Sequence, residues 1–382
     1  MPASAVTTAS AGRPRFIGSE IYRRSTYGGR HPLAIPRVST CIDLCRALGW
    51  LPDAAYVDSP RATPEELARF HDPAYIDAVQ RAEAAQGLPA EEQVLFNLGR
   101  NGNPIYPEVF RRPATACGAS ILAGRQLAAA PGVIYSPAGG THHGRPDRAS
   151  GFCYFNDPAL AILALLDGGV SRVFYLDVDA HHGDGVQAAF HDDPRVFTLS
   201  IHEDRRWPMR NDGIGSSGDR AGGAARNLPV PEGFNDSELD FLMEAAVLPL
   251  IEAFAPQALV LQCGADALAE DPLSKLMLSN GALWRVVAGV KDLAPRLLVL
   301  GGGGYNPWSV GRAWAGVWAT LNGFAIPEVL PAEAEAVLRD LSWRHSRGRH
   351  PPKAWFTTLA DPPRPGPVRP AIADLAVRVL AP

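Results

Sequence analysis

Long apolar runs are missing from this sequence of 382 residues. No stretch reaches the roughly 18 consecutive apolar residues that a helix needs to cross a bilayer. The opening stretch, MPASAVTTASAGRPR, also lacks the apolar centre of a signal peptide. We therefore expect a cytoplasmic protein that does not associate with membranes.

Cysteine is scarce, and neither sign of charge is in large excess. The five cysteines contain no CxxC pair, and an odd number suits a reducing compartment better than a disulfide framework. Cys41 and Cys45 lie one helical turn apart, and we expect buried apolar contacts there rather than metal ligands. The formal net charge of −4 gives no reason to expect nucleic acid as a direct ligand, because such partners usually need a basic face.

The sequence does contain short, nearly continuous apolar runs separated by amphipathic stretches. Such runs are typical of strands that are covered on both faces. The expected strands are residues 132–137, 172–179, 195–201, 257–264 and 296–301. Helices are expected at 237–255 and 281–293, after the cap Asn156, and after the capping box at 63–66. This alternation predicts an α/β domain with a mainly parallel central sheet flanked by helices.

Beyond about Gly323 the periodicity weakens. Residues 349–370 are rich in proline and arginine and show no sustained helical or strand pattern. We expect residues 323–382 to form a C-terminal extension that packs on the surface or is partly loose. Residues 16–322 are expected to form a single domain.

Acidic and imidazole side chains follow two of the expected strands. Asp177, Asp179 and His181 have a spacing of two, which places them on one side of an extended segment. Asp266 follows the strand at 257–264, and the carboxyl ends of parallel strands meet at one edge of a sheet. Any one of these residues alone could equally cap a helix or satisfy a loop backbone. Together they indicate a metal site.

The composition of this set restricts the metal. Asp179 and His181 can hold one ion, with Asp266 as the third ligand. Two carboxylates and one imidazole leave a coordination position open, which is typical of catalytic zinc. The set is rich in oxygen and has no thiolate, so Fe²⁺ could compete with zinc. The histidine argues against an oxygen cage for Mg²⁺ or Ca²⁺.

The other groups that a metal hydrolase needs follow further strands. His142 and His143 lie in a glycine-flanked turn, where Asp177 and Asp184 could each hold one imidazole. Such a histidine can take the proton of an attacking water and supply one to the leaving amine. Tyr305 comes after four glycines, whose backbone we expect to approach the metal closely or to adopt positive φ. Its hydroxyl would donate to the developing oxyanion.

Four segments in this order resemble the histone deacetylase family: GGTHHGRPDRASGFCYFND, YLDVDAHHGDGV, QCGAD and GGGGYNP. HPLAIPR and HDPAYI also fit, and the resemblance covers residues 16–322. It implies an arginase/deacetylase-like domain that removes acetyl or other short acyl groups from lysine side chains. The expected partner is then an acylated protein or peptide, or an acylated small amine. The oligomeric state stays open.

The resemblance also implies a role for each residue of the site. The residues that match the zinc ligands are Asp179, His181 and Asp266. The catalytic set is His142, His143, Asp177, Asp184 and Tyr305, with His143 as the general base and acid. A structural potassium ion would bind at Asp177 and Ser200. The residues that match the substrate-binding set are Gly151 and Phe152, in one wall of the lysine tunnel, and Arg37, near the cavity through which acetate leaves.

Two segments depart from the family pattern. The opposite tunnel wall is phenylalanine in most relatives, whereas this chain has Trp207 followed by a longer loop. The indole is expected to narrow or tilt the tunnel and so to change the acyl and substrate preference. Many relatives also place an aspartate at the rim to hold the substrate's backbone amides. Here we expect Asn103, or else Asn101, to substitute, more weakly because neither is charged.

Other functions make different demands on the sequence. Deacetylation of small polyamines would favour an acid at the gate; none lies near Asn103, although Glu203 and Asp204 lie in the Trp207 loop. A non-catalytic acyl-lysine binder or scaffold would tolerate the loss of Tyr305, a catalytic histidine or a ligand, and all are present. An arginase-like hydrolase with two metals would need a second set of bridging Asp and His residues, which we do not find.

Overall fold

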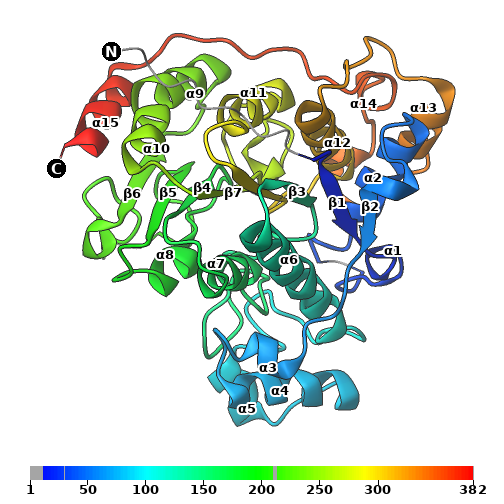
Figure 1. Cartoon of the computed structure of the whole chain (residues 1–382). Coiled ribbons are helices and arrows are strands. Elements are labelled where there is room, and N and C mark those ends of the chain that lie inside the picture. The colour runs from blue at the N-terminus through cyan, green and yellow to red at the C-terminus, as the bar shows by residue number, and fades with distance from the viewer. Residues whose placement is uncertain (1–11, 30, 210–212, 382) are drawn as a thin grey trace.

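The computed structural model describes residues 12–29, 31–209 and 213–381. Within these residues the centre is an eight-stranded sheet with the order β2-β1-β3-β8-β7-β4-β5-β6, and every neighbouring pair is parallel (Figure 1). The strands are β1 (Arg15–Gly18), β2 (Tyr56–Asp58), β3 (Gly132–Ser136), β4 (Val173–Asp177), β5 (Val196–Glu203), β6 (Ala225–Val230), β7 (Ala258–Gln262) and β8 (Arg296–Leu300). The predicted α/β class with a parallel sheet is confirmed.

Alternate residues of the central strands enter two different cores, because successive side chains point to opposite faces of a sheet. In β4, Phe174 and Leu176 pack on one face, whereas Val173 and Tyr175 pack on the other. Burial on both faces explains the nearly continuous apolar runs from which these strands were predicted. The strands that the sequence did not reveal are β1, β2 and β6, which are short or lie at an edge. Pro229 in β6 fits such an edge position.

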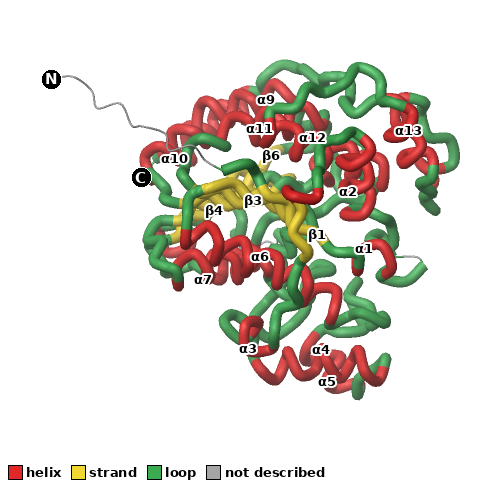
Figure 2. Tube along the Cα trace, turned by 45° about the vertical axis from the view of Figure 1, so that its right-hand side comes forward, coloured by secondary structure: helices red, strands yellow, loops and turns green. Residues whose placement is uncertain are grey.

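Helices cover both faces of the sheet (Figure 2). One face carries α2 (Val38–Ala47), α9 (Asp236–Leu242), α10 (Leu248–Phe254), α11 (Asn280–Val290) and α12 (Pro307–Asn322). The opposite face carries α6 (Arg111–Ala129), α7 (Asp157–Asp167) and α8 (Asp184–Ala189). The expected helix at 237–255 runs through α9, a π-helical turn at Met243–Val247 and α10. Asn156 caps α7 as expected, accepting from the backbone N–H of Ala159 at 3.0 Å.

A separate lobe extends below the sheet in Figure 1. It contains α3 (Pro64–Leu67), which begins at the predicted capping box, together with α4 (Pro73–Ala85) and α5 (Ala90–Phe96). A third apolar cluster joins this lobe to α6 and also includes Tyr154 and Tyr305. The lobe therefore lies beside the carboxyl ends of the strands. The short helix α1 (Ile21–Arg24) follows β1.

The C-terminal extension is packed against the domain. It contains α13 (Ala332–Arg339), α14 (Ala354–Thr357) and α15 (Pro370–Leu380), and its buried side chains Trp355, Ile372 and Val379 belong to the same core cluster as the sheet. Residues 358–369 have no regular secondary structure, yet Asp361 pairs with the buried guanidinium of Arg312 at 2.7 Å. The proline- and arginine-rich stretch is thus held by specific contacts rather than loose.

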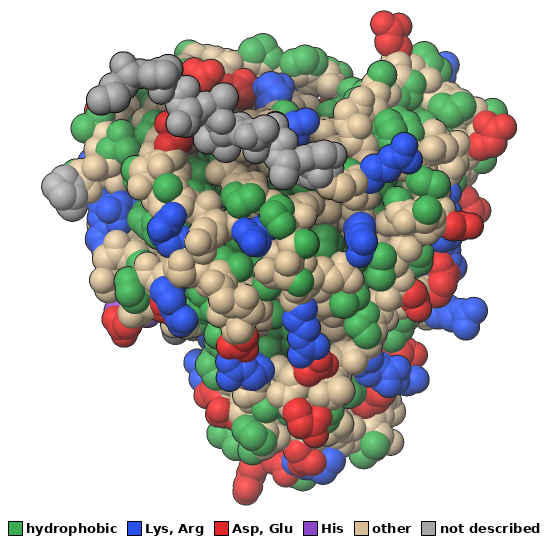
Figure 3. All heavy atoms as spheres, in the orientation of Figure 1, with side chains coloured by type: hydrophobic (Ala, Val, Ile, Leu, Met, Phe, Trp, Pro, Cys, Tyr) green, Lys and Arg blue, Asp and Glu red, His purple; other side chains and the backbone are tan. Residues whose placement is uncertain are grey.

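The cysteines and the surface charges lie as the composition led us to expect. Cys41 and Cys45 are fully buried, as expected, and both are free thiols. On the face shown in Figure 3, acidic and basic side chains are interspersed. Among the described residues, no helix is both long enough and apolar enough to cross a membrane.

Candidate metal centre and active site

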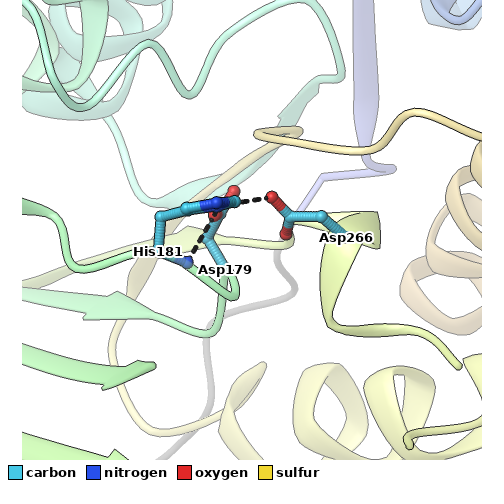
Figure 4. A group of neighbouring side chains, drawn as sticks. All are labelled: Asp179, His181 and Asp266. Carbon is cyan, nitrogen blue, oxygen red and sulfur yellow. Dashed lines mark hydrogen bonds and ion pairs between the residues drawn. The ribbon is translucent and has the colours of Figure 1, made fainter. Parts of the chain in front are cut away.

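Three side chains from two strand ends meet at the carboxyl edge of the sheet (Figure 4). Asp179 and His181 follow β4, and Asp266 follows the neighbouring strand β7. The Nδ1 of His181 lies 3.2 Å from Asp179 Oδ1 and 2.9 Å from Asp266 Oδ2. One ligand atom of each residue lies within 4.8 Å of the others. The structure thus brings together the three residues predicted to bind zinc.

The charges of this triad favour a bound cation. Burial disfavours the charged imidazole, but hydrogen bonds to Asp179 and Asp266 outweigh burial and raise the pKa of His181 to about 10. Burial and the charge of Asp179 raise the pKa of Asp266 to about 6. Two carboxylates that share one imidazole therefore attract positive charge, either as a proton or as a metal ion.

The glycine run after β8 packs directly against the carboxylates of Asp179 and Asp266. A Cβ on Gly303 would lie 2.0 Å from Asp266 Oδ2, and one on Gly302 would lie 2.9 Å from Asp179 Oδ2. Gly302 and Gly304 also have φ values of +128° and +139°, which favour glycine. Both expectations for the run, close approach and positive φ, are confirmed. A side chain at Gly303 would therefore collide with the carboxylate of Asp266.

His142 and His143 each form a dyad with a buried carboxylate. The Nδ1 of His142 lies 2.7 Å from Asp177 Oδ2, and the Nδ1 of His143 lies 2.7 Å from Asp184 Oδ1. Since a carboxylate accepts, Nδ1 carries the proton in each ring and Nε2 is the remaining nitrogen. The pairing expected from the sequence is therefore present. Asp184 is also bound by the guanidinium of Arg145, which directly follows the HisHisGly segment and was not predicted.

The two imidazoles differ strongly in their affinity for a proton. Burial opposes protonation of His142, but the charges of Asp177 and Asp179 outweigh it and raise its pKa to about 9. Burial and the neighbouring His142 lower the pKa of His143 to about 3. Two groups whose environments move their pKa values apart are typical of divided acid–base roles.

His181 of the triad and both members of the second dyad, His143 and Asp184, line one cavity of about 1070 Å³. Its lining includes His143, His181 and Tyr305, together with Phe152 and Trp207 from the two expected tunnel walls. The ring of Phe152 lies 6.1 Å from that of Tyr305, and the ring of Trp207 lies 4.7 Å from that of His143. A pocket with aromatic walls and a polar, titratable floor has the features of a small-molecule or side-chain binding site.

Comparison with known proteins agrees with this geometry. The histone deacetylase domain matches residues 31–321. The acetoin utilization protein AcuC of Bacillus subtilis (strain 168) is 35% identical over 333 residues, which are 83% of this chain and 84% of that protein. Histone deacetylase 9 of Arabidopsis thaliana is 36% identical over 310 residues, which are 80% of this chain and 72% of that protein. This chain belongs to the histone deacetylase family.

Other relatives extend the comparison. A putative histone deacetylase 2 of Caenorhabditis elegans is 36% identical over 80% of this chain, but the match spans only 61% of that protein. A crystal structure of an HDAC homolog from Aquifex aeolicus has a TM-score of 0.90 at 35% identity and covers 97% of this chain and 100% of its own. A structure of an HDAC homolog complexed with SAHA has the same values. The deacetylase fold is therefore shared over almost the whole chain, including the C-terminal extension.

Trp207, which was expected in the tunnel wall opposite Phe152, lines the cavity. Its side chain packs closely on the turn of Gly151, where a Cβ would lie 2.3 Å from the indole. The loop that carries it is anchored by Glu203, a buried residue that the sequence analysis considered only as a possible gate acid. The carboxylate of Glu203 binds Arg206 and accepts from the backbone N–H of Lys275 at 2.8 Å. The Trp207 loop is thus tied to the loop that follows Asp266.

The two rim asparagines occupy different environments. Asn103 has no exposed surface, and its Oδ1 accepts from the backbone N–H of Phe152 at 2.9 Å. It therefore supports the tunnel wall, and its burial corrects the expectation that it holds the substrate at the rim. Asn101, the other residue considered, lines the cavity and donates to Asn97 Oδ1 at 2.9 Å. Phe152, which Asn103 supports, has a φ of +67°.

The remaining predicted residues lie behind the pocket. Arg37 donates to the carbonyl of Gly302 at 2.8 Å, and its guanidinium lies 5.2 Å from the ring of Trp314. Asp177 and Ser200 are partners in the register of β4 and β5. Arg37 is thus placed beside the glycine run, and the two residues expected at a potassium ion lie side by side.

Proposed function

We propose that this protein is a zinc-dependent amidohydrolase that removes acetyl or other short acyl groups from the lysine side chains of proteins. The observation that carries the proposal is that one cavity is lined by the His143–Asp184 dyad, by Tyr305 and by His181, which meets Asp179 and Asp266 in the triad. Membership of the histone deacetylase family supports the reaction class.

The residues of the triad fit a catalytic divalent metal. Asp179, His181 and Asp266 would hold it, and two carboxylates and one imidazole suit zinc, with Fe²⁺ as a competitor. When bound, the ion would polarise the amide carbonyl and lower the pKa of a water molecule. The role of Gly303 is to leave room beside these carboxylates, since a Cβ there would meet Asp266.

His143 is the proposed general base and acid. Its lowered pKa keeps the imidazole neutral near pH 7, and its Nδ1 is committed to Asp184. The Nε2 is then available to take the proton of the attacking water and to return it to the leaving lysine amine. His142, with its raised pKa, carries positive charge that offsets Asp177 and Asp179.

Tyr305 is the proposed oxyanion donor. Burial and the charge of Asp266 raise the pKa of its hydroxyl well above the usual range, so the group stays protonated and can donate. A hydroxyl that donates to the tetrahedral oxyanion stabilises the transition state more than the ground state. The effect of one such donor is about 10²–10³-fold in kcat.

The expected potassium ion stays a prediction. Asp177 Oδ2 lies 2.7 Å from His142 Nδ1 and its Oδ1 accepts from the N–H of Asp179. The hydroxyl of Ser200 lies 2.8 Å from His202 Nδ1. We propose that a potassium ion here would act structurally, at the junction of β4 and β5.

The charges at the mouth favour acyl-lysine over acylated polyamines. A polyamine carries several positive charges and would need an excess of acid at the gate. Each acidic side chain of the Trp207 side of the mouth instead has a basic partner: Glu203 with Arg206, Asp204 with Arg205, and Glu232 with Lys275. The aromatic walls suit the apolar stem of lysine.

Turnover of a panel of substrates tests the proposal. Peptides with acetyl-lysine or longer acyl-lysines and N-acetylated polyamines are compared before chelation, after chelation and after zinc is added back. We expect peptide hydrolysis that chelation abolishes and zinc restores. A higher kcat/KM for an acetylated polyamine than for every peptide would overturn the substrate class. A rate insensitive to thorough metal removal would overturn the mechanism.

A further inference from the structure

A buried carboxylate outside the predicted site contacts the main chain of Tyr305. Asp271 lies in the loop between β7 and α11 and is only 1% exposed. Its Oδ2 accepts from the backbone N–H of Tyr305 at 2.6 Å, and its Oδ1 accepts from the N–H of Leu273 at 2.9 Å. The first contact joins two segments that are 34 residues apart, whereas the second is local to the loop.

The segment that precedes Tyr305 is held by contacts from other parts of the chain, including Asp179 to the N–H of Gly303 and Arg37 to the carbonyl of Gly302. Gly301 to Gly304 lack side chains, and two of them have strongly positive φ, so this backbone has little intrinsic preference for one conformation. The segment that follows is rigid, because Asn306 caps α12 by accepting from the N–H of Trp308 at 3.1 Å. Tyr305 therefore lies at the junction of a permissive segment and a fixed helix. The bond from Asp271 fixes the peptide at that junction.

Burying the carboxyl group of Asp271 lowers the stability of the folded state. Among the described residues, no Lys or Arg nitrogen pairs with this carboxylate, and Arg347 donates instead to the backbone oxygen of Asp271 at 3.0 Å. Burial raises the pKa of Asp271 above its usual range. A buried carboxyl without a cationic partner destabilises a protein and is more typical of functional sites than of cores.

We propose that Asp271 is a positioning residue that sets the distance between the Tyr305 hydroxyl and the reacting carbonyl. This inference rests on the proposed function, in which that hydroxyl donates to the oxyanion. Misplacement of a catalytic group by about 1 Å can reduce the rate by about 10²-fold. Asparagine at this position would keep the shape but offer one acceptor oxygen for two backbone N–H groups.

A double-mutant cycle separates positioning of Tyr305 from general support of the loop. Asp271→Asn is measured alone and in a Tyr305→Phe background, with the same acyl-lysine peptide. In the wild-type background we expect kcat to fall about 10–100-fold with KM changed less than about threefold. In the Tyr305→Phe background we expect less than about a twofold further loss, because the hydroxyl is already absent. Equal losses in both backgrounds would overturn the inference.

Matched controls keep the outcome interpretable. Glu270→Gln removes the ion pair with Arg364 from the same loop without touching Tyr305, and we expect near wild-type kcat. A loss equal to that of Asp271→Asn would show that any disturbance of the loop suffices, which contradicts the inference. If Asp271→Asn does not fold, Asp271→Ser, which keeps one hydroxyl acceptor, is put through the same cycle with the same criterion. The proposed function fails separately, if Tyr305→Phe alone leaves the rate unchanged.

Discussion

The floor and the rim of the pocket are built differently. On the floor, Asp179, His181 and Asp266 follow adjacent strands, are less than 9% exposed and are joined by hydrogen bonds. At the rim, Trp207 is 46% exposed and lies on a loop between strands. The sheet therefore fixes the groups proposed to bind the metal, whereas a loop holds the indole proposed to meet the substrate. Mutations on the floor should affect kcat, and mutations at the rim should affect mainly KM and substrate choice.

The largest effect is expected on the floor. We expect Asp266→Ala to lower kcat/KM by at least about 10³-fold, because the metal ion that Asp266 would help to hold would polarise the carbonyl and activate water. Elemental analysis of the purified variant should show loss of bound zinc. Asp240→Ala, which removes an exposed ion pair with Arg285, is the matched control and should keep both metal and rate. An Asp266→Ala variant with full zinc content would show that this residue is not a ligand.

Intermediate losses of kcat are expected for His143, the proposed proton carrier, and for Asp184, which holds its imidazole. We expect His143→Ala to lower kcat by about 10²–10⁴-fold, the range for general acid–base groups. Asp184→Asn should lower kcat by only about 10–100-fold, because the His143 imidazole remains but is less well oriented and less basic. Steady-state kinetics at saturating peptide measure both. A larger loss for Asp184→Asn than for His143→Ala would contradict the division of roles.

The smallest effect is expected at the rim. Trp207→Phe restores the side chain usual in the family, and we expect it to change KM and the ratio of acetyl to longer acyl substrates by up to about tenfold. The kcat for acetyl-lysine peptide should change by less than about threefold, since the dyad and the triad are untouched. If this variant lost as much kcat as His143→Ala, the contrast between floor and rim would be wrong.

Much of the pocket floor could be predicted because residues close together in the sequence specify it. Asp177 ends one apolar strand, Asp179 and His181 follow it, and the spacing of two already places them on one side. The glycine run before Tyr305 indicated close approach of backbone, and the structure shows it. The five strands of the centre were predictable since burial on both faces leaves continuous apolar runs.

The remaining features depend on contacts between distant segments. Asn103 and Asn101 are chemically alike in the sequence, and only packing shows that the first supports Phe152 whereas the second lines the cavity. No sequence motif marks Asp271, because its partner is the backbone N–H of Tyr305 in another loop, and a backbone group leaves no signal in the sequence. Strand β1 and the edge strand β2 are too short to give a periodic pattern. Irregular segments such as 358–369 are held by ion pairs and hydrogen bonds to distant residues, which leave no periodicity in the sequence.

The pairing of Asp361 with Arg312 has a practical consequence for the choice of expression boundaries. The family match ends at residue 321, which invites a recombinant fragment that stops there. Such a fragment would keep Arg312, whose side chain is 1% exposed, but would lose its carboxylate partner. It would also uncover the ring of Trp308, which packs on Trp355 at 5.4 Å. An unpaired interior cation costs about 3–5 kcal/mol, so the shortened fragment should accumulate in inclusion bodies while the full chain is recovered from the supernatant.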